Sequence, residues 1–279
     1  MVAREPLESL VHRIRSLQIQ GAKQIAVESL KWLRPLVREK GFGKDFEHAA
    51  KALEGARPTA VVLHNCLDIL RKEKNVKAID RLLDTLARTS KQIGAHGARL
   101  IPDGATVMTH CHSTEASSVI LAAKAAGKNV RVIATKTEPK MQGIITLREL
   151  SAAGVPTTLI ADSATAFFMK DADLVLVGSD AMRKDGNINK IGTLTLAVVA
   201  KEFKKPFYVA GNTLKLDPRK RFVIEERQAS EIYQDIASIK GAAARNPAFD
   251  LTPWKYVKRV VTEKGVLTPG NLMRLLKEK

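Results

Sequence analysis

The chain has 279 residues, and 45% of them are hydrophobic, which is enough to fill the core of one large domain or two modest ones. No apolar run approaches the roughly 20 residues that span a bilayer, and the amino terminus shows no apolar signal segment, so no membrane contact is expected. The two cysteines form neither a disulfide framework nor a zinc-ribbon spacing, so a reducing cytoplasm is expected. Lys and Arg outnumber Asp and Glu by 46 to 29, which gives a net charge of +17. This charge is either a solvated surface or a site for anionic partners, nucleic acid or phosphorylated metabolites, and charge alone does not choose between these two partners. Only 5% of the residues are aromatic, so stacking on single-stranded RNA has little support.

Residues 7–97 are predicted to be helical. Their apolar residues recur at three- and four-residue spacing, for example at Leu7, Leu10 and Ile14. Breaks fall at residues 41–43, where two glycines free the backbone, and at Arg57, because the following proline disfavours helix at the residue before it. We therefore expect about four helices in an all-helical domain that covers residues 1–102.

After residue 102 the pattern changes to short β-branched runs that alternate with helical stretches. Candidate strands cover residues 105–110, 130–134, 157–160, 174–177, 207–210 and 259–262, and a last helix covers residues 271–276. Thr146 and Glu149 have capping-box spacing, while Gly127 and Gly154 are typical helix stops. The fold class is therefore predicted as α/β, with a Rossmann-like, doubly wound parallel sheet over residues 103–279.

Ligands of such sheets bind beyond the carboxyl ends of the strands, and three polar clusters occupy that position. They cover residues 110–114, 178–180 and 189–193. In the first cluster, neighbouring side chains of an extended chain point to opposite faces, so His110, Cys111 and His112 cannot readily bind one metal ion, and no metal is expected. Cys111 is either a small buried hydrophobe or a reactive thiol, whose pKa would be lowered by the N–H groups of a helix that starts at Ser113.

The other two clusters suggest an acid and a phosphate site. Asp180 either caps a turn or points at the same rim as Cys111. Asn189 and Lys190 precede a glycine and an apolar helix, an arrangement suited to binding a phosphate with an ammonium, an amide and backbone N–H groups. Neither a P-loop nor a dinucleotide fingerprint is present, so nucleotide cofactors have no support.

These clusters carry a resemblance to a known superfamily. The matching segments are residues 20–23 (QGAK), 57–60 (RPTA), 108–113 (MTHCHS), 185–193 (DGNINKIGT), 205–210 (KPFYVA) and 246–253 (NPAFDLTP). They resemble archaeal ribose-1,5-bisphosphate isomerases, methylthioribose-1-phosphate isomerases and the regulatory subunits of translation initiation factor 2B. The resemblance implies a homodimer built through the α/β domain or a hexamer assembled from such dimers, and a chemistry that needs neither a metal nor an organic cofactor.

The resemblance also implies roles for individual residues. Cys111 and Asp180 would be the acid/base pair, which the initiation-factor subunits generally lack in part or in full. Substrate contacts would fall on Gln20, Gly21, Ala22, Lys23, Arg57, Ser113, Thr114, Glu115, Asn189, Lys190 and Lys215. The chain departs from the isomerase pattern in three places: the segment 20–23 moves a cation from its first to its last position, Glu115 stands where a neutral or basic residue is expected, and Glu138 stands where arginine is usual. Lys136 or Lys140 is expected to pair with such an added carboxylate.

We therefore expect a sugar-phosphate aldose–ketose isomerase, most simply one that converts ribose 1,5-bisphosphate to ribulose 1,5-bisphosphate, with Cys111 as the base near C2 and Asp180 as the acid at the sugar oxygens. The alternative is a non-enzymatic, regulatory-subunit-like protein that senses a phosphorylated ligand and binds initiation factor 2. A methylthioribose-1-phosphate isomerase is the third reading, and it matches the segment 108–113 less closely.

Overall fold

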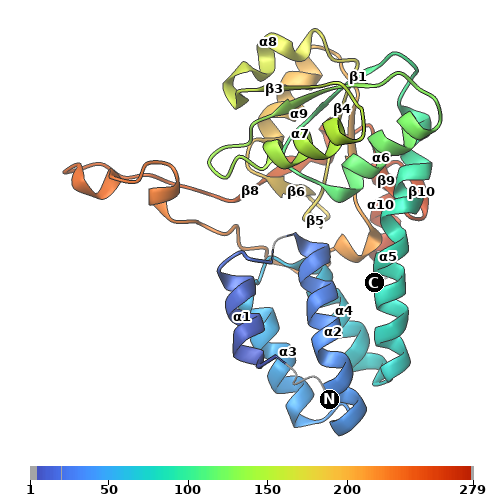
Figure 1. The fold of residues 1–279 in the computed structure, drawn as a ribbon, viewed down its shortest axis with the longest axis vertical. Helices are drawn as coiled ribbons and strands as arrows, with labels where there is room; N and C mark the ends of the chain where they lie inside the picture. Colours follow the sequence, from blue (N-terminus) through green and yellow to red (C-terminus); the bar gives the residue numbers. More distant parts are fainter. Residues whose placement is uncertain (1–4, 20, 278–279) are drawn as a thin grey trace. The chain divides into compact units, whose positions relative to one another are not determined.

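The structure, a computed structural model, describes residues 5–19 and 21–277, which divide into two compact units (Figure 1). The units comprise residues 1–89 and 90–279, and each is described by itself. The division falls inside helix α5 (Val76–Gly97), whereas the sequence places a domain boundary after residue 102. In the part of the chain that the structure describes, no helix is long and apolar enough to cross a membrane.

The first unit is helical, as predicted. Among its described residues it contains α1 (Leu7–Arg15), α2 (Ala22–Lys40), α3 (Lys44–Ala56), α4 (Val61–Glu73) and the first part of α5. The three- and four-residue spacing of apolar positions gives each helix one buried face. Leu30, Phe46, Leu53 and Leu67 are completely buried in this core.

The second unit is built on a seven-stranded sheet with the order β10-β9-β7-β4-β1-β2-β3. Its strands are β1 (Thr106–Thr109), β2 (Arg131–Thr135), β3 (Thr157–Ile160), β4 (Leu174–Val177), β7 (Phe207–Ala210), β9 (Arg259–Thr262) and β10 (Gly265–Leu267). All neighbours pair in parallel except β9 and β10. The predicted parallel α/β fold is confirmed, with one antiparallel strand added at an edge.

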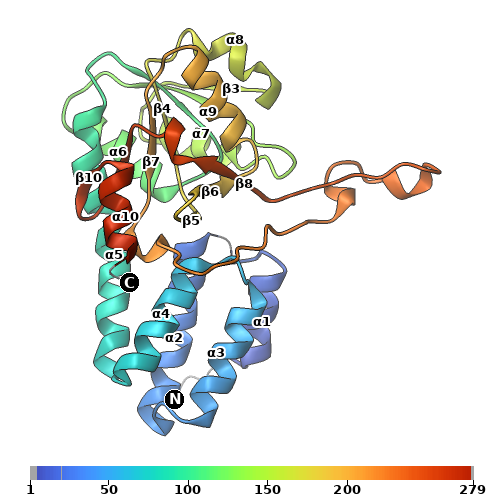
Figure 2. The ribbon, with the colours of Figure 1, turned by 180° about the vertical axis from the view of Figure 1, so that it is seen from behind.

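Helices cover both faces of this sheet (Figures 1 and 2). The core on one face includes α6 (Thr114–Ala125) and α7 (Gly143–Ala152); the core on the other includes α8 (Thr165–Met169), α9 (Thr193–Glu202) and α10 (Pro269–Lys277). Val107 belongs to the first core and its neighbour Met108 to the second, as the two-residue alternation of a strand requires. The predicted cap at Thr146 is wrong, because α7 already begins at Gly143 and Thr146 lies inside its first turn.

A second, small antiparallel sheet was not predicted. It consists of β5 (Ala181–Met182), β6 (Gly186–Lys190) and β8 (Phe249–Pro253). Asn189 and Lys190 therefore end a strand rather than open a helix. Gly186 fits against β8 because a Cβ there would lie 2.4 Å from the carbonyl oxygen of Thr252.

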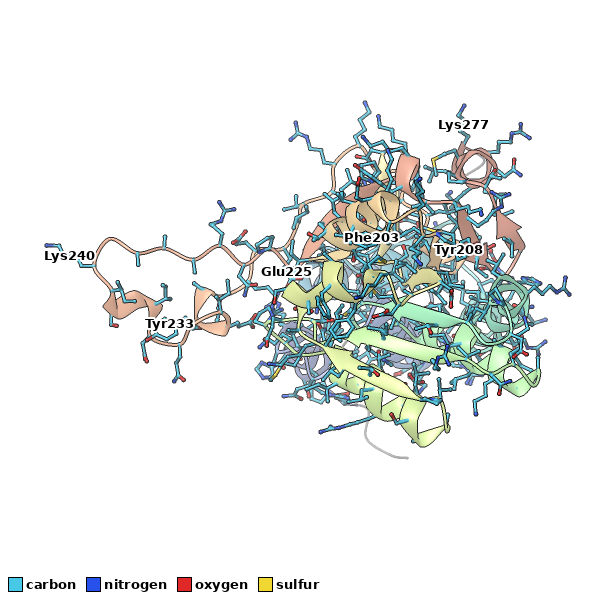
Figure 3. The ribbon with its side chains drawn as sticks, turned by 90° about the horizontal axis from the view of Figure 1, so that it is seen from above. Phe203, Tyr208, Glu225, Tyr233, Lys240 and Lys277 are labelled. Carbon is cyan, nitrogen blue, oxygen red and sulfur yellow. The ribbon has the colours of Figure 1, made fainter. Side chains whose placement is uncertain are left out.

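Between β7 and β8 the chain forms a long segment that projects away from the sheet and carries Tyr233 and Lys240 (Figure 3). Three short 3-10 turns lie between the two strands, η3 (Thr213–Lys215), η4 (Ala229–Glu231) and η5 (Ile236–Ser238), and the last two belong to the projecting part. Glu231 joins this segment to the loop before α7 through an ion pair of 2.8 Å with Lys140.

Candidate active site

The candidate site lies where the parallel strands β1 and β4 end. Cys111 follows β1 and Asp180 follows β4, and the two strands are neighbours in the sheet. Their carboxyl ends meet at one edge, so both residues lie along the same rim. Gly178 lets the loops close, since a Cβ there would lie 2.5 Å from Cβ and Oγ of Ser113 and 3.7 Å from Oδ1 of Asn189. This close approach joins the ends of β1, β4 and β6.

The backbone of Cys111 adopts an unusual conformation that neighbouring side chains hold in place. Its φ is +65°, in the left-handed region that residues with a Cβ rarely occupy. Its N–H donates to Oγ1 of Thr137 over 2.8 Å, and its carbonyl oxygen accepts from Oγ1 of Thr146 over 2.9 Å. The thiol donates to Oε1 of Gln142 over 3.6 Å. These contacts fix the direction of Sγ.

The thiol of Cys111 is harder to ionise than the sequence suggests. Burial raises its pKa to about 11, and this effect outweighs the opposing influence of Lys190 and of the His112 N–H group. Asp180 raises the same pKa further, so the charges of Lys190 and Asp180 both act on the sulfur. The expectation that helix N–H groups lower the thiol pKa is therefore wrong, because desolvation dominates, and Cys111 rests as a neutral thiol near pH 7.

The two histidines beside Cys111 are held by separate partners. In the buried ring of His110, Nδ1 lies 2.6 Å from Oγ1 of Thr135 and Nε2 lies 2.7 Å from the carbonyl oxygen of Ile191, and burial lowers its pKa. Nδ1 of His112 instead contacts Oγ1 of Thr146 at 3.2 Å. Within residues 5–19 and 21–277, no three His, Cys, Asp or Glu side chains are grouped to hold a metal ion. Ring nitrogens of both histidines are thus engaged by strand, loop and helix groups.

The start of α9 is already occupied by a carboxylate. Oδ2 of Asp250, from β8, accepts the N–H groups of Gly192 at 2.8 Å and of Leu194 at 3.0 Å. Burial raises the pKa of Asp250 to about 6, and its Oδ1 is buried without a hydrogen-bond partner. These N–H groups are therefore already satisfied by Asp250, and their expected contact with a phosphate stays a prediction. Asp250 lies in the segment 246–253, which the resemblance singled out. Its contact with the N–H groups at the start of α9 depends on the pairing of β6 with β8, which the local sequence does not reveal.

Asn189 and Lys190 present different chemistry to the site. The amide nitrogen of Asn189 donates to Oγ1 of Thr193 over 3.0 Å, and the side chain is buried. Lys190 is half-buried, and its Nζ lies 5.4 Å from the ring centroid of Phe249. Among the described residues, no carboxylate forms an ion pair with Lys190. Its charge is available to an anion.

Glu115 and Lys215 form a buried ion pair. Oε1 of Glu115 lies 3.1 Å from Nζ of Lys215 and also accepts from Nδ2 of Asn212 over 3.1 Å. The two charged side chains are 4% and 6% exposed. Lys215, which the resemblance assigns to a phosphate, is thus already bound to the carboxylate that departs from the isomerase pattern.

The other predicted contact residues are distributed over both units. Gly21, Ala22, Lys23 and Arg57 belong to the first unit, where Gly21 precedes α2 with a φ of +81° and Arg57 ends α3. Gln20 lies outside the described residues. In the second unit, Ser113 caps α6 by accepting the Ala116 N–H at 3.3 Å, and Thr114 is exposed. Their roles in substrate binding stay predictions.

The added carboxylate at Glu138 is compensated as expected. Its Oε1 pairs with Nζ of Lys136 at 2.5 Å, whereas Lys140 pairs with Glu231 of the projecting segment. Glu138 is exposed, and its N–H donates to Asp162. This departure therefore removes little charge from the interior of the site.

The fold and the site define a class: an α/β protein of Rossmann-like topology whose carboxyl edge carries titratable groups and a lysine, as small-ligand sites of such sheets do. A model described as the Initiation factor 2 subunit family matches residues 18–269, and the chain belongs to this family.

Its relatives include enzymes and translation factors. The chain is 39% identical to the ribose 1,5-bisphosphate isomerase of Archaeoglobus fulgidus, over 95% of this chain and 90% of that protein. It is 38% identical to the methylthioribose-1-phosphate isomerase of Geobacter metallireducens, over 94% and 87%. The solved structure of translation initiation factor eIF-2B from Pyrococcus horikoshii OT3 superposes with a TM-score of 0.83 at 27% identity, covering 96% of this chain and 99% of that one.

Proposed function

We propose that the chain is an aldose–ketose isomerase of a ribose phosphate, with Cys111 and Asp180 as its proton-transfer groups. The observation that carries this proposal is the placement of three groups at one rim: Cys111 and Asp180 follow the neighbouring strands β1 and β4, and Lys190 ends β6, whose Asn189 lies close to Gly178 after β4. An acid, a base and a cation within mutual range are what such a reaction needs. The ribose 1,5-bisphosphate isomerase relatives support this substrate as the first to assay.

The chemistry is ring opening followed by a balanced transfer of one proton from C2 to C1, with the phosphate kept on the C1 oxygen. Asp180 donates a proton to the ring oxygen, and the bond from this oxygen to C1 breaks. The Cys111 thiolate removes the proton from C2, which leaves an enol with a C1–C2 double bond. Asp180 then takes the proton from the oxygen on C2, which becomes the ketone, and Cys111 returns its proton to C1. No electrons leave the substrate, so the step requires no redox cofactor.

The mechanism also requires the Cys111 thiol to be deprotonated. Cys111 must lose a proton before it acts as the base, and its raised pKa of about 11 opposes this loss. The Lys190 ammonium favours the thiolate, because an opposite charge stabilises the ionised form. Lys190 therefore serves both the thiolate and the phosphate.

The test is turnover by the purified full-length chain, with ribose 1,5-bisphosphate supplied and ribulose 1,5-bisphosphate measured. We expect conversion by the unmodified chain and a loss of roughly 10²- to 10⁴-fold in Cys111→Ser and Asp180→Asn. The matched control is Cys66→Ser, since Cys66 is buried in the core of the first unit and has no part in the chemistry.

Two outcomes would separate the alternatives. Binding of sugar phosphates without conversion, together with retention of initiation factor 2 on the immobilised chain, would favour the regulatory-subunit-like reading. Conversion of 5-methylthioribose 1-phosphate but not of ribose phosphates would favour the other isomerase reading. The homodimer or hexamer implied by the resemblance is tested on the same sample by light scattering.

A further inference from the structure

A buried cluster of polar side chains lies directly beside the candidate acid/base pair. Its members are Glu115 at the start of α6 and Asn212 and Lys215 after β7. The Glu115 carboxylate binds both partners at 3.1 Å, and all three residues are at most 4% exposed. The carboxylate and the ammonium cancel each other, so the cluster presents no net cation.

The cluster is joined to the active-site loops at two points. Ser113, two residues after Cys111, donates from Oγ to Oε2 of Glu115 over 3.4 Å. The second point is Gly211, which packs between Ser179, the residue before Asp180, and Lys215. A Cβ added to Gly211 would lie 3.0 Å from Cβ of Ser179 and 3.5 Å from Cδ of Lys215. The cluster therefore packs against the loops that carry Cys111 and Asp180.

The polar atoms left over in this region include an acceptor suited to a sugar hydroxyl group. Oδ1 of Asn212 and Oγ of Ser179 are buried without a hydrogen-bond partner. The amide oxygen of Asn212 can only accept, so it fits an O–H group and not a phosphate oxygen, whereas the Ser179 hydroxyl can donate to either.

We propose that Glu115 is a specificity-determining residue: it binds Lys215 and so leaves Lys190, within the described part of the second unit, as the lysine near Cys111 that no carboxylate neutralises, and the site selects a ribose carrying a single phosphate and disfavours a bisphosphate. This inference rests on the proposed isomerase function and narrows its substrate. The size of the effect follows from Coulomb's law. At ~8 Å and an effective dielectric constant of ~20, one positive charge that is neutralised and so no longer attracts a phosphate lowers the affinity roughly 30-fold, and mobile salt reduces this factor.

The experiment compares kcat/KM of the full chain for ribose 1,5-bisphosphate, ribose 1-phosphate and 5-methylthioribose 1-phosphate, at low and high ionic strength. We expect the unmodified chain to favour a monophosphate by at least tenfold at low salt. Glu115→Gln keeps the shape of the side chain and removes its charge, so it is expected to raise kcat/KM for the bisphosphate roughly tenfold more than for either monophosphate, mainly through a lower KM.

Glu263→Gln is the matched control. Glu263 accepts the Thr213 N–H at 3.0 Å and so holds the same turn, but it does not contact Lys215. A change of preference in both variants would show an effect of the turn and overturn the assignment to charge. So would a preference of the unmodified chain for the bisphosphate, a measurement that does not depend on either variant folding. If none of the three sugars is converted, the proposed function fails, and calorimetric binding of the same ligands still decides the selection between one and two phosphates.

Discussion

The buried carboxyl group of Asp250 makes the stability of the second unit depend on pH in a direction that can be calculated. The pKa of this group is about 6 in the folded chain, against 3.8 for an unperturbed aspartate. Desolvation by burial raises it, while the N–H groups of residues 192 to 194 oppose the rise without cancelling it. The folded state therefore holds this proton more tightly than the unfolded state does.

The sign of the effect follows from proton linkage. Below pH 4 both states are protonated, so stability associated with the bound proton is fully present. Between pH 4 and pH 6 the unfolded state has lost the proton and the folded state has not, so the free energy of unfolding falls as the pH rises. A difference of about 2 pH units corresponds to about 3 kcal/mol, which is lost by pH 7.

Asp250→Asn removes the titration and keeps an oxygen that accepts the N–H groups of α9. We expect the stability of this variant relative to the unmodified chain to increase by about 3 kcal/mol between pH 4 and pH 7, on top of a constant offset. Urea unfolding at each pH measures it, with Trp32→Phe in both chains so that fluorescence reports only Trp254 of the second unit. A difference that is flat over this range, or that decreases with rising pH, would refute the reasoning.

Three further predictions concern the active-site rim. If the Cys111 thiolate is the base, kcat/KM for the sugar phosphate rises about tenfold per pH unit from pH 7 towards the thiol pKa of about 11; a profile that is flat or falls above pH 8 would assign the thiol as the acid instead. Gly178→Ala places a Cβ 2.5 Å from Ser113, so we expect a loss of about 1–3 kcal/mol in thermal unfolding measurements together with slower turnover; unchanged stability would mean that the loops adjust without cost. Lys215→Met leaves the Glu115 charge buried without its ion-pair partner, and we expect it to lower the free energy of unfolding by about 3–5 kcal/mol. Adding Glu115→Gln to the same chain should recover most of this loss; additive losses in the double variant would contradict the ion pair.

Local sequence patterns predicted the scaffold of the second unit well. The β-branched runs at residues 105–110 and 174–177 correspond to β1 and β4, and the polar residues after them reach one rim because parallel strands end together. The same rule predicts that Cys111 and Asp180 lie along one rim. This prediction requires only the local sequence pattern of each strand and the topology of a parallel sheet.

Features that depend on contacts between distant segments could not be predicted in the same way. Residues 186–190 pair with residues 249–253 in the small sheet, and this pairing places Asp250 on the start of α9. The raised pKa of Cys111 results from burial by several loops, while its neighbours in sequence suggest only the N–H groups that would lower it. Thr146 has the spacing of a cap, yet the helix begins earlier and its hydroxyl holds the Cys111 carbonyl group.

The same long-range contacts decide how the site handles an anion. The sequence offers three positive features for a phosphate in the second unit: the N–H groups at the start of α9, Lys215 and Lys190. Asp250 occupies the N–H groups, and Glu115 occupies Lys215. In the described part of this unit, Lys190 is thus the one of the three without a carboxylate partner. Since the same lysine also favours the Cys111 thiolate, a bound phosphate withdraws part of that support, and the site gains most from a ligand that places few negative charges near the sulfur.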